Sequence, residues 1–229
     1  MIYLTGDTHG DYDLFKLNSK FFPRGKSLTK KDYVIVCGDF ACCWDNGDFD
    51  KYIQGWYNDK PWTTLFVDGN HENHDLLDKY PVVEWNGGKV HMISDSIIHL
   101  MRGQVYTIDG TKIFTFGGAQ SHDMWHRKEG ESWWAREMPS DEEYEEGLKN
   151  LETNNYEVDF VITHCGPDEV VDILRELNER KDMTHDKLTN YFGIVKEDLK
   201  FKKWYMGHYH KDLNLGKYRI LYDDVIPLG

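Results

Sequence analysis

Short runs of apolar residues, rich in β-branched and aromatic side chains, recur along the first part of the chain. They lie at Ile2–Thr5, Tyr33–Cys37 and Thr63–Val67, and each is followed within two residues by a glycine. Runs of this kind predict buried β-strands. Between them, apolar positions at helical spacing predict one helix over 11–19 and another over 49–57. This alternation of strands and helices is typical of parallel α/β units.

The pattern changes after residue 81. Turn signals at Asn86-Gly87-Gly88 and Asp109-Gly110 separate strand-like runs, and they predict an antiparallel meander. Beyond them, Ser140 and Glu143 stand at capping-box spacing at the start of a helix. Further strands are predicted at Phe160–Thr163, Lys203–Met206 and Tyr218–Tyr222, and further helices from Pro167 and over 186–199. No repeat or low-complexity tract divides the chain, so we expect a single domain over 1–229.

Residues of the types that bind metals directly follow five of the apolar runs. In chain order they are Asp7 with His9, Asp39, Asn70 with His71, His164, and His208 with His210. In parallel α/β sheets, binding sites gather beyond the carboxyl ends of the strands. One such coincidence would be noise, but five in succession indicate a site.

Composition excludes some classes of protein. The chain is 40% hydrophobic and 14% aromatic, which indicates a packed core rather than global disorder. Its 40 acidic residues outnumber 27 basic ones, for a formal charge of −13. This balance makes stable nucleic-acid binding an unfavourable interpretation, because that affinity rests on lysine and arginine neutralising phosphates. Phosphate chemistry remains open, since bound divalent cations supply local positive charge.

The cysteines and the hydropathy pattern suggest a compartment. The four cysteines form no C-x-x-C pair and are too sparse for a disulfide scaffold. No apolar run approaches ~20 residues and no basic segment precedes an apolar one, so we expect neither a membrane span nor a signal peptide. We therefore expect a cytoplasmic protein, and the sequence carries no signal for a particular oligomeric state.

The motifs D-x-H, G-D, G-N-H-E, T-H and G-H-x-H follow one another along the chain, from Asp7 to His210. As an ordered set they closely resemble the calcineurin-like metallophosphoesterase superfamily. The resemblance implies an α/β fold in which two packed mixed β-sheets are flanked by helices. It also implies that two metal ions are held at the ends of the strands.

Matching the motifs position by position assigns a role to each residue. The resemblance implies that Asp7, His9 and His210 hold one cation, that Asn70, His164 and His208 hold the other, and that Asp39 bridges both. His71 would act as a general acid for the leaving oxygen, a role that suits an imidazole. Mixed nitrogen and oxygen ligands suit Mn, Fe, Zn, Co or Ni, and Mn is the metal we favour.

These roles predict a hydrolase in which metal-bound hydroxide attacks a phosphate ester. The first expectation is a phosphomonoesterase. A phosphodiesterase acting on a nucleotide or nucleic acid is the alternative among enzymes. A non-catalytic metal-binding scaffold is the alternative outside them, and the complete ligand set together with His71 argues against it.

The chain departs from the protein serine/threonine phosphatase branch at two positions where that branch carries phosphate-gripping arginines. Here Cys42 and Cys43 follow the G-D motif, and Val67-Asp68 precede G-N-H-E. An arginine fork can donate two hydrogen bonds to one phosphate. We expect Arg127 or Arg136 to supply this contact from a lid-like insertion at about 119–138, which also carries three tryptophans.

Overall fold

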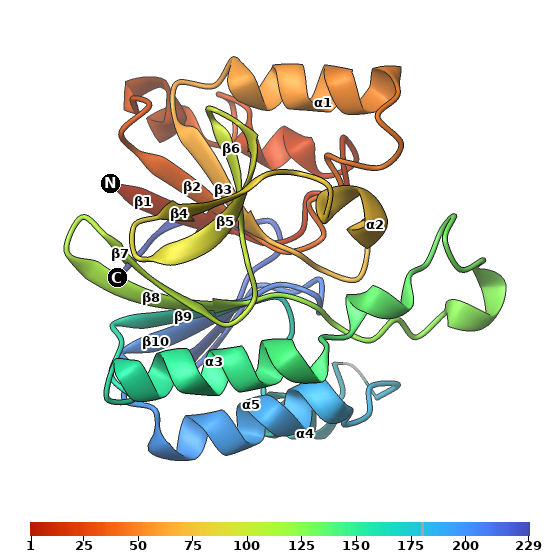
Figure 1. The fold of residues 1–229 in the computed structure, drawn as a ribbon, viewed down its shortest axis with the longest axis vertical. Helices are drawn as coiled ribbons and strands as arrows, with labels where there is room; N and C mark the ends of the chain where they lie inside the picture. The colour runs from red at the N-terminus through yellow and green to blue at the C-terminus, as the bar shows by residue number, and fades with distance from the viewer. Residues whose placement is uncertain (180) are drawn as a thin grey trace.

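The computed structural model describes residues 1–179 and 181–229 and arranges them in four layers (Figure 1). Two β-sheets lie face to face in the middle. Helix α1 (Asp48–Asn58) covers one of them, and the other is covered by α3 (Asp141–Thr153), α4 (Asp168–Glu176) and α5 (Lys187–Asp198). A single-turn helix, α2 (His74–Leu77), lies at one end of the first sheet. The predicted α/β fold of two packed mixed sheets flanked by helices is confirmed.

The first sheet holds seven strands in the order β13-β1-β2-β3-β6-β5-β4. Their bounds are β1 Ile2–Thr5, β2 Tyr33–Cys37, β3 Thr63–Val67, β4 Val82–Trp85, β5 Gly88–Ser94, β6 Ile97–Leu100 and β13 Ile226–Pro227. Strands β1, β2, β3 and β6 run parallel, while β13, β5 and β4 add antiparallel edges.

The second sheet holds six strands in the order β11-β12-β10-β9-β8-β7. Their bounds are β7 Gln104–Ile108, β8 Thr111–Phe116, β9 Phe160–Thr163, β10 Lys203–Met206, β11 Leu213–Leu215 and β12 Tyr218–Ile220. Strands β8, β9, β10 and β12 are parallel. The parallel strands of both sheets therefore present their carboxyl ends along one side of the molecule, where α2 lies and where the N- and C-termini do not (Figure 1).

Alternate residues of each central strand face different layers, as the pleat of a strand requires. In β1, Ile2 and Leu4 are buried between the two sheets, while Tyr3 is buried on the α1 side. In β10, Tyr205 faces the space between the sheets and Trp204 faces the helices on the other side. Both faces of each sheet are covered, which explains why the strands read as continuous apolar runs rather than as alternating ones.

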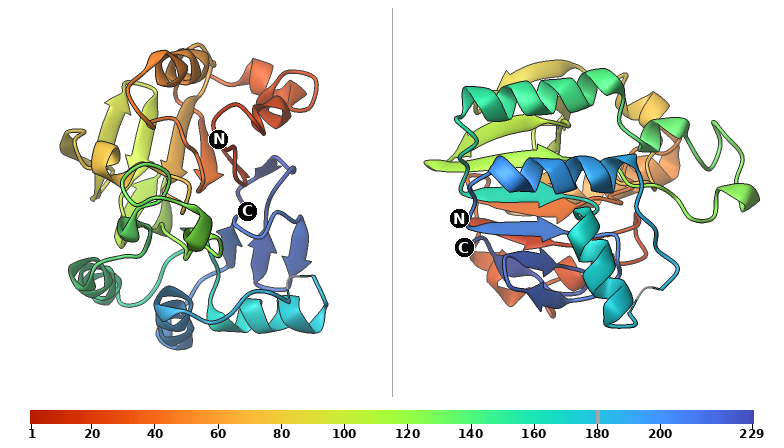
Figure 2. Two further views of the ribbon diagram at one scale, coloured as in Figure 1. Left: turned by 90° about the vertical axis from the view of Figure 1, so that its right-hand side faces the viewer. Right: turned by 90° about the horizontal axis from the view of Figure 1, so that it is seen from below.

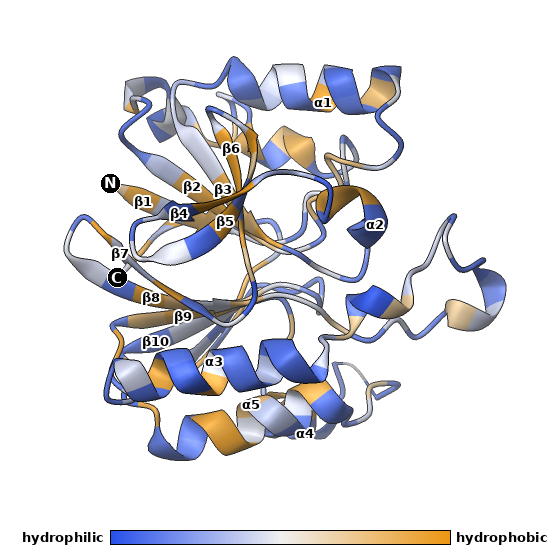
Figure 3. Ribbon diagram, in the orientation of Figure 1, coloured by the Kyte–Doolittle hydropathy of each residue, from blue (hydrophilic) through white to orange (hydrophobic). Residues whose placement is uncertain are grey.

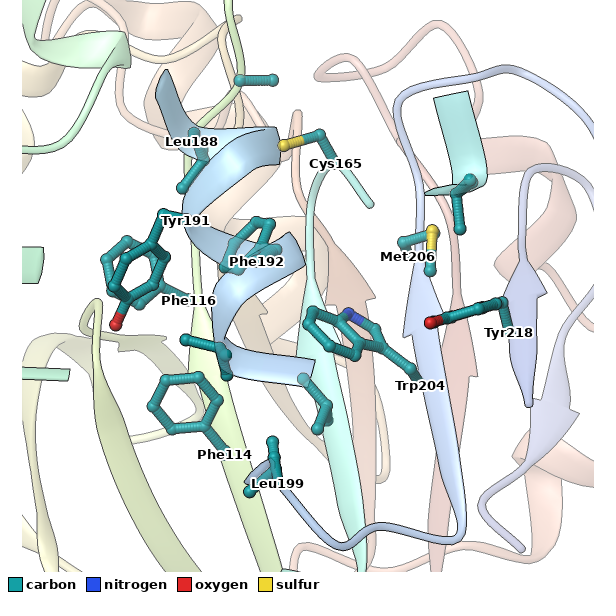
Figure 4. Packing of buried hydrophobic residues seen from close by; sticks show 14 of the residues in the cluster. Phe114, Phe116, Cys165, Leu188, Tyr191, Phe192, Leu199, Trp204, Met206 and Tyr218 are labelled. Atoms are coloured by element: carbon teal, nitrogen blue, oxygen red, sulfur yellow. The ribbon is translucent and has the colours of Figure 1, made fainter. Parts of the chain in front are cut away.

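Aromatic side chains fill the layer between the second sheet and its helices (Figure 4). Phe192 of α5 meets the ring of Trp204 edge to face at 5.4 Å, and Phe116 contacts Tyr191 at 5.2 Å. The face of α3 that is turned to the viewer is largely hydrophilic, whereas α5 also carries hydrophobic turns (Figure 3). This burial anchors β9 and β10, the two strands that lead to the histidines near the end of the chain.

Two local predictions are wrong. The helix expected over 11–19 is only a 3-10 turn at Leu14–Leu17, because Lys16 is drawn inward to the carbonyls of Asp7 and Tyr222. The expected meander is split between the sheets. Its two hairpins form as predicted, but β6 pairs in parallel with β3 while β7 belongs to the second sheet.

Residues 119–138, the arm, leave β8 and return to α3 at the carboxyl-end side of the sheets. The arm extends away from the body of the protein (Figures 1 and 2). Its regular structure consists of 3-10 turns at Met124–His126 and Ala135–Glu137. Trp134 anchors the base of the arm, because its indole N–H donates to Asp75 at 3.1 Å and its ring meets Trp44 at 5.3 Å. Trp125, by contrast, is 78% exposed.

Candidate metal centre

The residues expected to form the site all lie just beyond the carboxyl ends of parallel strands. Asp7 and His9 follow β1, Asp39 follows β2, Asn70 and His71 follow β3, His164 follows β9, and His208 and His210 follow β10. The structure brings them together from both sheets, so the site lies across the carboxyl-end edges of the two sheets.

Several of these residues hold an unusual backbone conformation. His9, Asp39, His208 and His210 have φ values of 44°, 47°, 66° and 51°, in the left-handed region that non-glycine residues rarely occupy. Such conformations typically cost about 1–3 kcal/mol each and persist at functional sites. Gly38 also has a positive φ, of 94°, and a Cβ there would lie 2.1 Å from Nδ1 of His164. The chain is therefore bent sharply to aim these side chains at one point.

Asp39 lies at the centre of the arrangement, and it is only 1% exposed. Its Oδ2 is 3.3 Å from Nε2 of His9, and its Oδ1 is 3.3 Å from Nε2 of His164. Oδ1 also accepts the backbone N–H of His71 at 2.7 Å. One carboxylate thus presents an oxygen to each of two histidines, as a bridging ligand would.

The opposite ring nitrogen of each of these histidines is already engaged. Nδ1 of His9 lies 2.7 Å from Oδ2 of Asp13, and Nδ1 of His164 lies 2.7 Å from the carbonyl of Cys37. A carbonyl or carboxylate oxygen accepts a hydrogen bond, so Nδ1 is the donor and Nε2 is left to bind. Partners of this kind orient metal-ligating histidines. Sequence reasoning did not identify Asp13, although its place four residues after His9 was a usable signal.

Asp7 contacts His208 and His210, the two histidines closest to the C-terminus. This buried carboxylate accepts the backbone N–H of His208 at 3.0 Å, and its Oδ2 is 3.1 Å from Nε2 of His210. One ligand atom from each of Asp7, His9, Asp39 and His210 lies within 4.8 Å of all the others. These are the three residues expected at the first cation together with the expected bridge.

On the other side of Asp39, Oδ1 of Asn70 lies 3.2 Å from Nε2 of His164. The ring of His208 meets that of His164 edge to face at 5.0 Å. The expected ligands of the second cation therefore also lie together. Glu72, two residues after Asn70, accepts the backbone N–H groups of Phe40 and Ala41 and so holds the loop that carries Asp39.

The charge of the site suits divalent cations. Among residues 1–179 and 181–229, no lysine or arginine forms a salt bridge with the Asp7 or Asp39 side chain. Burial lowers the pKa of His164, but Asp39 and Asp7 outweigh it and raise that pKa to about 10. Burial also lowers the pKa of His9, but Asp39, with help from Asp7 and Asp13, outweighs it and raises that pKa to about 9. Two buried carboxylates in need of positive charge, ringed by imidazole nitrogens, fit such ions.

His71 stands beside the cluster and meets the arm. Arg127 approaches its ring, with Nη1 3.0 Å from Nδ1. Nη2 also lies 3.4 Å from Nε2 of the same ring. A guanidinium only donates hydrogen bonds, and the shorter of the two contacts makes Nδ1 the acceptor. Burial and Arg127 lower the pKa of His71, while Asp39 opposes them. Arg127 is further held by Asp123 and the carbonyl of Ser132.

Arg136 and Arg102 are engaged outside the site. Arg136 pairs with Glu143 at 2.9 Å and approaches Asp78 at 3.4 Å. Arg102, which is 5% exposed, donates twice to Asp68. Cys42 and Cys43 are buried with their sulfur atoms 3.3 Å apart. Arg127 contacts His71 of the predicted site, whereas Arg136 pairs with Glu143 and Asp78. A phosphate contact from Arg136 stays a prediction.

Three further histidines are buried, one in α2 (His74) and two in the first sheet (His91 and His99), and sequence reasoning did not single them out. The rings of His91 and His99 stack at 5.2 Å, and Nε2 of His99 is 3.1 Å from Asp68. Nε2 of His74 has no hydrogen-bond partner within the described part of the chain. Burial, assisted by Arg102, lowers the pKa of His74 to about 3. The native protein therefore keeps His74 neutral.

Acid should weaken the metal-free fold through His74. An unfolded histidine has a pKa of about 6.5, so the stabilisation from the neutral native ring is complete above that pH. As pH falls toward 3, the unfolded chain gains a proton that the native chain does not, costing about 1.4 kcal/mol per pH unit. His74→Phe should flatten the fall in the free energy of unfolding between pH 6.5 and 5, measured with urea. His185→Gln, at an exposed histidine, should keep the wild-type slope, and equal slopes in all three proteins would contradict the assignment.

Known proteins resemble this chain over different lengths. A family model described as calcineurin-like phosphoesterase matches residues 1–212. Lariat debranching enzyme A of Xenopus laevis is 28% identical over 138 residues, covering 53% of this chain and 24% of the relative. The chain thus spans about a quarter of that relative's length. A candidate 5′-nucleotidase of known structure from Staphylococcus aureus aligns with 14% identity and a TM-score of 0.49, over 96% of this chain and 48% of the other. Within the described residues, no helix is both long and apolar enough to cross a membrane.

Proposed function

This chain belongs to the calcineurin-like phosphoesterase family. We therefore propose that it hydrolyses phosphate esters at a site for two divalent cations, and that phosphate monoesters are its preferred substrates. The observation that carries the proposal is the position of Asp39, whose two oxygens face His9 and His164 at 3.3 Å each. A carboxylate shared in this way is what a binuclear site requires. We take residues 1–229 as one catalytic domain and manganese as the first metal to test.

In this proposal each side of Asp39 holds one cation. The ligands are Asp7, His9 and His210 on one side, Asn70, His164 and His208 on the other, and Asp39 on both. When bound, two such cations neutralise phosphate charge and lower the pKa of a water molecule that can then attack phosphorus. Asp13 and the Cys37 carbonyl keep the histidine rings turned toward the site.

His71 and Arg127 act on the substrate itself. In its imidazolium form, which the negative charge of a bound phosphate favours, His71 can donate a proton to the departing ester oxygen and return to the neutral ring. Arg127 reaches the same ring from the arm, so its fork lies where a phosphate beside His71 would be met. The arm then serves as a lid that carries the Arg127 guanidinium to the site, whose core lacks the phosphate-binding arginines of the phosphoprotein phosphatases.

Arg127→Ala should raise KM or lower kcat/KM about tenfold or more, because a charge-assisted hydrogen bond contributes roughly 1.5–3 kcal/mol. Metal content and melting temperature should not change, since Arg127 contacts no expected ligand among the described residues. Arg136→Ala is the matched control, because its guanidinium pairs with Glu143 instead. Steady-state kinetics on the best phosphate ester from a substrate screen, run with added Mn²⁺, provide the measurement. Full kcat/KM in both variants would rule out the lid role.

A phosphodiesterase is the second candidate, and one observation favours it. The relative of 28% identity is named a lariat debranching enzyme, and debranching is phosphodiester hydrolysis. The two candidates are separated by comparing kcat/KM for p-nitrophenyl phosphate and bis-p-nitrophenyl phosphate under the same Mn²⁺ concentration. Our first proposal predicts the larger value for the monoester. A larger value for the diester would transfer the proposal to the second candidate.

A further inference from the structure

The two ends of the arm meet behind Asn70. Ser121 lies near its start and Glu137 near its end, and the two are joined by a pair of hydrogen bonds. The Ser121 backbone N–H donates to Oε1 of Glu137 at 2.7 Å, and its hydroxyl donates to Oε2 at 2.6 Å. The Asn70 side-chain amide donates in turn to Oγ of Ser121 at 3.2 Å. A continuous relay therefore runs from Glu137 through Ser121 to Asn70.

Every member of this relay is buried: Asn70 is 6% exposed, Ser121 2% and Glu137 1%. Within residues 1–179 and 181–229, the Glu137 carboxylate forms no salt bridge, and each of its oxygens accepts a hydrogen bond from Ser121. Burial raises the pKa of Glu137, and the two Ser121 donors oppose that rise. Burying a carboxylate without a cation is costly. Packing alone gives no reason to place it there.

The direction of the hydrogen bonds supplies a reason. The Ser121 backbone N–H and hydroxyl address both oxygens of Glu137 and so favour its ionised form. An ionised carboxylate can only accept, so the Ser121 hydroxyl uses its single hydrogen for the bond to Glu137. Oγ can then only accept from Asn70, which obliges the amide to present its NH₂ group to Ser121. The amide oxygen consequently points the other way, toward Nε2 of His164 at 3.2 Å. Asn70 could bind a cation only in this orientation, because its NH₂ group has no lone pair to offer.

We propose that Ser121 and Glu137 are positioning residues that fix the side-chain amide of Asn70 with its oxygen toward the second cation site. The inference rests on the proposed function, because it presumes that Asn70 is a ligand. It also makes the arm part of the metal centre. Its ends orient Asn70, while Arg127 between them meets the adjacent His71. Sequence reasoning treated the arm as a substrate lid alone.

Glu137→Gln tests the relay by reversing it. The glutamine oxygen would keep the Ser121 backbone N–H, so its NH₂ group would face and donate to the Ser121 hydroxyl. That hydroxyl would then donate to Asn70 and draw the amide oxygen away from the site. Partners outside the ligand set typically contribute 10- to 100-fold to metal affinity. Titrating chelator-treated protein with Mn²⁺ in a calorimeter should show one of two dissociation constants rising by about that factor, with the other unchanged.

Two further variants keep the test decisive. Ser121→Ala removes the relay hydroxyl without touching the carboxylate, and it should weaken the same binding step. Glu131→Gln is the matched control, since it removes one negative charge from an exposed part of the arm where Glu131 pairs with Lys128. The melting temperature of each metal-free variant shows whether the fold is intact. Combining Glu137→Gln with Asn70→Ala should add no further loss of affinity, because the relay would have nothing left to orient.

The outcomes separate the relay from the proposed function. If wild-type protein binds two Mn²⁺ ions and both Glu137→Gln and Ser121→Ala keep both constants, the relay is wrong and the proposed function stands. If the two variants shift both constants as much as they lower the melting temperature, the residues serve the fold alone and the relay is again wrong. If wild-type protein binds fewer than two ions, the proposed binuclear site fails, and the relay fails with it.

Discussion

Asp39→Asn should abolish turnover and metal retention together. Asp39 presents one oxygen to Nε2 of His9 and the other to Nε2 of His164, on opposite sides of the site, so its loss affects both cations at once. An amide offers a single neutral oxygen, and the site would lose one unit of negative charge. His71 N–H could still donate to the amide oxygen, so the loop itself should hold. Metal content by elemental analysis and turnover should be measured on the same preparation.

Asp50→Asn is the matched control for this substitution. Asp50 is also 1% exposed, and its Oδ2 accepts three backbone N–H groups from Trp44, Asp45 and Asn46. Its loss should lower stability but leave the metal content at two ions per chain. An Asp39→Asn variant that stays active with two ions per chain would contradict the bridging role.

His71→Ala should keep both cations yet slow the reaction by about 10²- to 10⁴-fold, the range typical of general acid catalysis. The effect should depend on the leaving group. An alkyl phosphate needs its departing oxygen protonated and should show the full loss, whereas p-nitrophenolate leaves unaided and should show a smaller one. His126→Ala, at an exposed histidine on the arm, should behave as wild type.

The same comparison separates His71 from its neighbour. Arg127→Ala should reduce kcat/KM by similar factors for both substrates, because binding the phosphate does not depend on the leaving group. Equal losses for alkyl and nitrophenyl phosphate in His71→Ala would remove His71 from the role of acid. It would then remain a residue whose backbone N–H holds Asp39.

Much of the fold could be predicted from the sequence because each of the two sheets is buried on both of its faces. A strand such as Thr63–Val67 must then be apolar throughout, and its ends fall where the structure places β3. The turns Asn86-Gly87 and Asp109-Gly110 both have positive φ at each residue, which is the local requirement that the sequence signals. Pairing between distant strands has no such local signal. The sequence therefore predicts one continuous meander where the chain in fact passes from β6 in the first sheet to β7 in the second.

The sequence predicted the candidate site, because residues of metal-binding types directly follow predicted strands. It did not predict the contacts that support those residues. Asp13, Ser121 and Glu137 are ordinary polar residues in sequence, and only the fold brings them against His9 and Asn70. Lys16 is a similar case, since a lysine on an expected helix reads as a surface residue. In the structure it is 1% exposed and donates to two backbone carbonyls. Such contacts join segments far apart in the chain, and spacing along it cannot reveal them.

The most direct test of the central claim is to locate manganese in crystals of the protein by anomalous scattering at the manganese edge. The binuclear assignment predicts two peaks flanking the Asp39 carboxylate, roughly 3.5–4 Å apart as in other two-metal sites. One peak should lie toward His9 and His210, and the other toward Asn70 and His164. A single peak, or two peaks that do not share Asp39, would contradict the account.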